Sequence, residues 1–191
     1  MPKRYNERQI TPEMMKQAAY KDKLKLLKEH QLNKDSHSQR CEFLLRLSIA
    51  RSFKGCNQLY FPHNMDFRGR VYPIPPHLNH MGADLNRGML EFSEGKPLGK
   101  EGLRWLKIHL ANKIGKDKLP LDERAAYAEE IIEEVHQCAE DPRNNKFWLK
   151  AENPWQTLAC MFELSAAMKL PNPEEYISRA HVHVDGSCNG M

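Results

Sequence analysis

The chain has 191 residues, of which 40% are hydrophobic and 28% are charged, with a formal net charge of +4. This composition predicts a globular protein, because no stretch reaches the roughly 20 apolar residues that a membrane-spanning helix needs. The first ten residues lack the apolar segment of a secretory signal, and we see no cleavable targeting segment.

Positive charge is concentrated in the first third of the chain. Residues 1–58 hold 13 Lys and Arg against 6 Asp and Glu, whereas residues 59–191 hold 16 against 19. A basic arm of this kind can follow a phosphate backbone, although lysines on a solvated helix face are the commoner explanation.

Two helices are predicted in this basic segment. The first spans residues 11–32, with Thr11 as N-cap and Pro12 at the first helical position, and the second spans residues 36–54. The stretch that follows, residues 57–80, is rich in aromatics and prolines and predicts short strands joined by a rigid loop.

More helices are predicted after this loop: a short one near residue 85, then residues 100–114, 121–139 and one that begins at Pro154. Asn153 would cap the last helix, with Gln156 completing a near capping box. Its core-facing residues would be Leu158, Met161, Phe162 and Met168. A strand at residues 181–184 and a turn at Asp185 end the series. We therefore predict an α+β fold that is mostly helical.

One candidate site is formed by His181, His183 and Asp185. Alternation along a strand would place the three side chains on one face, as in an H-x-H-x-D site for zinc or iron in metal-dependent hydrolases. The simpler interpretation is an edge strand with polar alternation, and the chain offers no later ligands to complete such a set.

A second candidate is the turn "DGSCNG", Asp185 to Gly190. In a tight strand exit, the Asp185 carboxylate and a main-chain carbonyl can converge on a hard cation such as magnesium. A plain Asx turn is the alternative.

The third candidate is "MDFRGR", Met65 to Arg70. Arg68 and Arg70 flank Gly69, which lets the guanidinium groups and the main chain approach phosphate oxygens, and Asp66 would orient one of the arginines. A surface turn with an internal Asp–Arg pair explains the same residues.

Five motifs together carry a resemblance to a known family. They are "YFPHNMDFRGRVYP", "LEFSEGKPLG", "WLKIHLAN", "NPWQTLAC" and "HVDGSCNG". In this order and spacing they resemble the single-subunit, phage-type DNA-directed RNA polymerases, and most closely those of animal mitochondria. The resemblance extends from about residue 36 to the end.

The resemblance implies a right-hand polymerase fold. Residues 1–58 would be the end of the thumb, and residues 59–191 the first part of the palm, truncated after the D-G-S-C-N-G motif.

The resemblance also implies which residues form the site. Asp185 would be the catalytic residue and bind two Mg²⁺ ions, Gly186 would lend its carbonyl to the metal, and Asp66, Arg68, Gly69 and Arg70 would contact nucleic acid.

The implied function is template-dependent nucleotidyl transfer in mitochondrial transcription. The partners would be a DNA template, the RNA product, NTPs and mitochondrial transcription factors, with no membrane. The family's later motifs, including a second catalytic Asp, are absent, as are a promoter-binding region and a targeting segment. We therefore expect a fragment that is inactive by itself. A non-catalytic nucleic-acid-binding fragment is the alternative, and the H-x-H-x-D hydrolase is a remote one.

Overall fold

The computed structural model describes residues 11–13 and 20–183, and all structural statements below concern these residues. The chain divides into two compact units, residues 1–55 and 56–191. We describe each unit by itself.

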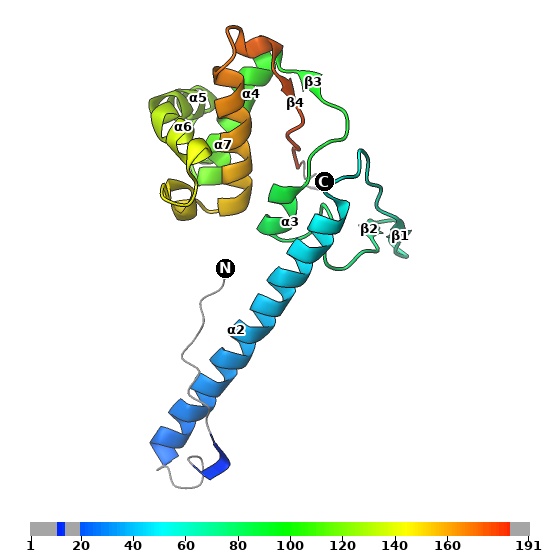
Figure 1. Cartoon of the computed structure of the whole chain (residues 1–191), viewed down its shortest axis with the longest axis vertical. Coiled ribbons are helices and arrows are strands. Elements are labelled where there is room, and N and C mark those ends of the chain that lie inside the picture. Colours follow the sequence, from blue (N-terminus) through cyan, green and yellow to red (C-terminus); the bar gives the residue numbers. More distant parts are fainter. Residues whose placement is uncertain (1–10, 14–19, 184–191) are drawn as a thin grey trace, which may run out of the picture. The chain divides into compact units, whose positions relative to one another are not determined.

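The first unit contains one long helix, α2, which spans Tyr20–Phe53 (Figure 1). The predicted interruption between residues 32 and 36 is therefore wrong. Asn33, Lys34 and Asp35 are neither Gly nor Pro, so nothing in them stops a helix, and Asp35 accepts a hydrogen bond from Gln31 across one turn (2.8 Å). Of the predicted first helix, Pro12 and Glu13 are helical, and residues 14–19 lie outside the described residues.

The second unit begins with a hairpin. Strand β1, His63–Met65, pairs antiparallel with β2, Val71–Pro73, and Asn64 lies opposite Tyr72. This confirms the predicted short strands.

Most of the regular secondary structure of the second unit is helical, as Figure 1 shows. In chain order they are α3 (Asp84–Met89), α4 (Gly99–Ile114), α5 (Leu121–Glu130), α6 (Ile132–Glu140), the 3₁₀ helix η1 (Phe147–Lys150), α7 (Pro154–Met168) and the 3₁₀ helix η2 (Pro173–Glu175). A second small sheet pairs β3, Lys96–Pro97, with β4, Ile177–Ser178. The mostly helical α+β class is confirmed.

The helix predicted over residues 121–139 is divided at Ile131 into α5 and α6. The division is a local distortion, because the Ile131 N–H still donates to the Tyr127 carbonyl (3.2 Å) and the Val135 N–H to the Ile131 carbonyl (3.0 Å). Helical hydrogen bonding therefore continues across it.

A single apolar core joins α4, α5, α6 and α7, which we call the helical layer. Its fully buried members include Leu110, Ala128, Val135, Met161 and Leu164, each 0% exposed. Burial of side chains of this size is the main stabilising contribution in a unit of this kind.

The N-terminus of α7 is capped by a residue from another helix. The Asp84 carboxylate, on α3, accepts from the Trp155 N–H (2.8 Å), the Gln156 N–H (3.1 Å) and the Gln156 side chain (3.0 Å). Asn153 makes no side-chain capping bond, so the predicted capping box is wrong. Asp84 satisfies the free N–H groups instead, and its negative charge suits a helix N-terminus.

Gly88 allows α3 and α7 to approach each other. A Cβ at this position would lie 2.8 Å from the Trp155 main chain, closer than real Cβ atoms come.

No helix in the described part of the chain is long and apolar enough to cross a membrane.

Candidate nucleic-acid and catalytic site

The loop of the β1–β2 hairpin is built around Asp66 and Gly69. The Asp66 N–H donates to the Arg70 carbonyl (2.8 Å), and the Gly69 N–H donates to the Asp66 carbonyl (3.0 Å). Gly69 has φ of +78°, the left-handed conformation that closes a three-residue hairpin loop and that favours glycine. The conformation of the loop is therefore determined by hydrogen bonds and a glycine within the loop itself.

The Asp66 side chain organises this loop from inside. One carboxylate oxygen accepts from the Arg68 and Arg70 N–H groups (2.9 Å each), and the other accepts from the Arg68 guanidinium at Nη2 (2.9 Å) and Nε (3.1 Å). The pKa of Asp66 is lowered, chiefly by the Arg70 N–H, with burial acting in the opposite direction. Asp66 thus orients Arg68, a pairing that both a nucleic-acid loop and a plain surface turn would contain.

Arg70 differs from Arg68 because its side chain is not engaged. It is exposed, and no residue that the structure describes gives its guanidinium a hydrogen bond or an ion pair. Its five N–H donors are therefore available to a ligand such as a phosphate.

Phe67 at the tip of the hairpin was not among the predicted site residues. Its ring is 97% exposed, and the Arg68 guanidinium lies over it, 5.6 Å from the centroid. An exposed aromatic ring beside arginines is a surface on which nucleic-acid bases stack. The signal was present in the sequence as an apolar residue between Asp66 and Arg68, at a turn where a polar one is usual.

His181 and His183 lie close together, as alternation predicted. Their ring centroids are 4.9 Å apart and the rings are nearly perpendicular. However, residues 181–183 form no strand, so the predicted strand is wrong over these residues. Strand β3 has only two residues and pairs with β4, and residues 181–183 pair with no strand in the described part of the chain.

Asp185 and Gly186 lie outside the described residues. Within the described ranges, no group of three His, Cys, Asp or Glu side chains is placed to hold a metal ion.

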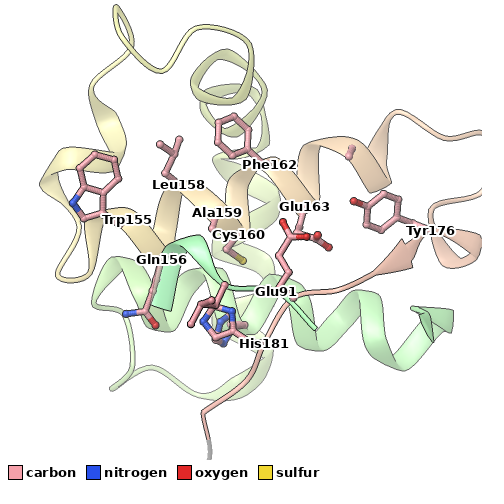
Figure 2. Close-up of a pocket in the computed structure, with 15 residues that line it drawn as sticks. Glu91, Trp155, Gln156, Leu158, Ala159, Cys160, Phe162, Glu163, Tyr176 and His181 are labelled. Carbon is pink, nitrogen blue, oxygen red and sulfur yellow. The ribbon is translucent and has the colours of Figure 1, made fainter. Parts of the chain in front are cut away.

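A pocket of about 470 Å³ lies between α4, α7 and the segment that follows β4 (Figure 2). Figure 2 shows the carboxyl groups of Glu91 and Glu163 approaching each other. Burial raises the pKa of Glu163 and Glu91 raises it further, while a hydrogen bond from the Ser178 hydroxyl (2.6 Å) acts to lower it.

The other polar groups of the pocket are held uncharged. Burial lowers the pKa of His109 to about 4, with smaller effects from Lys113, His181 and His183. Burial also raises the pKa of the Cys160 thiol to about 12, so this cysteine is not an activated nucleophile.

Comparison with known proteins identifies the family. The family model described as DNA-dependent RNA polymerase matches residues 96–191, half of the chain, including the Asp185 motif. This chain belongs to the DNA-dependent RNA polymerase family. A mitochondrial DNA-directed RNA polymerase of Neurospora crassa is 55% identical over 156 residues, which are 81% of this chain and 11% of the relative.

Plant polymerases of the family are similar to the same degree. DNA-directed RNA polymerase 2 of Arabidopsis thaliana, described as chloroplastic/mitochondrial, is 52% identical over 163 residues, or 84% of this chain and 16% of the relative. The chloroplastic polymerase 3B of Nicotiana tabacum is 51% identical over 172 residues, or 88% of this chain and 18% of the relative. An alignment over 88% of the chain necessarily includes the β1–β2 hairpin. The chain spans less than a fifth of the length of these polymerases.

Proposed function

We propose that these residues belong to a DNA-directed RNA polymerase that transfers nucleotides from NTPs to a growing RNA chain on a DNA template. The observation that carries the proposal is the family match over residues 96–191, which ends in the D-G-S-C-N-G motif. The names of the relatives support mitochondria as its location, although some relatives are chloroplastic.

In this proposal, Asp185 and the Gly186 carbonyl hold two Mg²⁺ ions. A carboxylate and a main-chain carbonyl are hard oxygen donors, the kind that Mg²⁺ prefers, so the donor set fits. When bound, the ions would stabilise charge on the attacking and leaving oxygens of an in-line displacement. Asp185 is the catalytic residue that these 191 residues contribute.

The hairpin loop supplies the nucleic-acid interface. The main-chain bonds to Asp66 and the left-handed Gly69 hold the loop rigid, so Arg70 is presented to a phosphate at little cost in conformational entropy. Arg68 is oriented by Asp66, and Phe67 offers its exposed face to a base.

In this proposal, the right-hand polymerase fold positions both Asp185 and the hairpin loop. We propose that residues 1–58 end the thumb and residues 59–191 begin the palm, and that the complete enzyme works with mitochondrial transcription factors. One catalytic carboxylate cannot hold two ions in register. We therefore expect the isolated 191-residue chain not to incorporate nucleotides.

A second function, non-catalytic binding of nucleic acid by the isolated chain, is favoured by the unengaged Arg70 and the exposed Phe67. The hydrolase interpretation stays a remote alternative, because its third ligand, Asp185, lies outside the described residues.

Two variants test whether Asp185 serves catalysis while Arg70 serves nucleic-acid binding. Asp185→Asn should abolish nucleotide incorporation by a complete polymerase that carries it, and should leave binding of an RNA–DNA hybrid by the 191-residue chain within about twofold. Arg70→Met should weaken that binding about fivefold or more and reduce the slope of log K against log salt by about one. Arg143→Met is the matched control, since Arg143 is also an exposed loop arginine. Loss of binding in the Asp185 variant would mean that its role is misplaced.

A further inference from the structure

Glu163 is a carboxylate in the second half of α7 that faces the segment around β4. It is partly buried and lines the pocket that Tyr176 and His181 also line (Figure 2). Neither the family match nor the predicted sites assign it a role. A carboxylate that leaves water is costly unless hydrogen bonds compensate it, so the groups that donate to Glu163 indicate what it does.

Three consecutive residues are tied to the Glu163 carboxylate. The Ser178 hydroxyl donates to Oε2 (2.6 Å), and the Arg179 N–H donates to the same carboxylate. The Ala180 N–H donates to the Ser178 Oγ (3.2 Å), so this hydroxyl accepts one hydrogen bond while it donates another. Glu163 therefore holds residues 178–180 against α7, Ala180 through the hydroxyl and the other two directly.

The β3–β4 ladder that holds the same segment is short. Each strand has two residues, and Pro97 of β3 has no N–H to donate. Outside the ladder, the Leu98 N–H donates to the Tyr176 carbonyl and the Phe92 N–H to the Arg179 carbonyl (3.0 Å each). Register is weakly specified in so short a pairing, so the side-chain bonds from α7 add to what defines it.

We propose that Glu163 is a positioning residue for Asp185, because it fixes the register of the chain that leads to this carboxylate. Asp185 follows Ala180 by five residues. A slip of one residue in an extended segment moves each side chain by about 3.3 Å and turns it to the opposite face. Misplacement of a reacting group by about 1 Å can cost on the order of a hundredfold in rate. The inference rests on the proposed function, in which Asp185 is the catalytic residue.

The activity test uses a complete polymerase that carries these residues. Glu163→Leu removes both acceptor oxygens and should lower kcat for nucleotide incorporation about tenfold or more. The KM for NTPs should stay within about twofold, because Glu163 does not contact substrate in this proposal. Glu163→Gln keeps one acceptor oxygen and should recover most of the activity. Ser178→Ala should also lower kcat, and the double variant should be no worse than Glu163→Leu, since both changes break the same hydrogen bond.

Hydrogen–deuterium exchange in the 191-residue chain tests the anchoring without any activity. In Glu163→Leu, the Arg179 N–H loses its acceptor, and the Ala180 N–H loses a hydroxyl that Glu163 holds in place. Both amides should therefore exchange about tenfold faster or more. The Leu164 amide, in the core of the helical layer, should keep its wild-type rate, which shows that α7 itself is intact.

Glu174→Leu is the matched control. Glu174 is an exposed glutamate of η2, four residues before Ser178, so its loss removes the same charge near the same segment. Neither kcat nor the exchange rates should change. Leucine at position 163 lies beside Phe162 and Ala166 of the pocket and should leave the thermal midpoint unchanged. If the midpoint falls, Ser178→Ala, which removes only a hydroxyl, decides the activity test.

The outcomes separate this inference from the proposed function. If exchange rises in Glu163→Leu while kcat equals that of Glu174→Leu, the contact is structural only, so the inference is wrong and the proposed function stands. Unchanged exchange would show that Glu163 does not anchor the segment. A rise in KM that matches the fall in kcat would also contradict a positioning role. If the wild-type polymerase incorporates no nucleotides, or Asp185→Asn keeps full activity, the proposed function is wrong and the inference falls with it.

Discussion

The β1–β2 hairpin and the helical layer are held together in opposite ways. The hairpin loop depends on hydrogen bonds among five consecutive residues around Asp66, while its apolar Phe67 remains 97% exposed. The helical layer depends on side chains such as Leu110 of α4 and Leu164 of α7, which are 0% exposed and lie more than 50 residues apart in sequence.

This difference suggests that the two regions have different roles: the helical layer stabilises the fold, and the hairpin loop presents exposed side chains. A loop that satisfies its own main chain leaves outward side chains such as Phe67 and Arg70 exposed to a ligand, as the proposed nucleic-acid interface requires. The helical layer instead buries its side chains in a common core, and Ala180 of the segment after β4 packs against that core. Substitutions in the two regions should therefore affect different measurements.

The largest effect on stability is expected from the core of the helical layer. Leu164→Ala removes a fully buried side chain of α7 and should lower the free energy of unfolding by about 2 to 5 kcal/mol. Urea denaturation followed by far-UV circular dichroism measures this. Leu149→Ala is the control, since that side chain is 50% exposed and should cost well under half as much. Equal losses in the two variants would contradict the position of the core.

Acid should destabilise the helical layer before it affects the hairpin loop. The folded-state pKa of His109 is about 4, below its ordinary value of 6.5, so the unfolded chain binds a proton first. The contribution of neutral His109 is complete above pH 6.5 and is lost as the pH falls from 6.5 to about 4, on the order of 2 to 3 kcal/mol. Asp66 has a lowered pKa, so it stays ionised over this range.

His109→Gln tests this acid sensitivity. Unfolding free energies measured between pH 7 and 4.5 should become flatter, with about one proton fewer taken up on unfolding. His181 and His183 also have lowered pKa values, so a part of the pH dependence should remain. An unchanged slope in the variant would show that His109 is not the group responsible.

Local signals in the sequence were sufficient for most of the helices and for the hairpin. The helix predicted over residues 100–114 is observed as Gly99–Ile114, because a periodic apolar stripe and the left-handed Gly115 mark its face and its end. The short strands of the hairpin were predicted because Gly69 and the flanking aromatics are local signals as well. The family resemblance, which rested on motifs of this local kind, is confirmed by the family match.

Contacts between distant residues could not be predicted in the same way. Asp84 caps a helix that begins 70 residues later, and no local pattern identifies it as the partner of Trp155 and Gln156. Phe162 was predicted in the core, yet it is 44% exposed and lines the pocket, because the apolar stripe of α7 meets α4 and α6 along only part of its width. The strand at residues 181–183 failed for the same reason, since a strand needs a partner that periodicity alone does not supply.

The smallest effect on stability, and the sharpest contrast with Leu164, is expected at Asp66. Asp66→Ala removes the acceptor for two N–H groups and for Arg68, but these donors lie in an exposed loop and water can replace the carboxylate. The thermal midpoint should therefore change by no more than about 2 °C, within the range of ordinary surface substitutions. Binding of an RNA–DNA hybrid should nevertheless weaken about threefold or more, because Arg68 and Arg70 lose their fixed presentation. Asp66→Asn keeps one acceptor oxygen and should fall between the two. If Asp66→Ala lowers the midpoint as far as Leu164→Ala does, the hairpin loop supports the fold as the core does, and the separation of recognition from support is wrong.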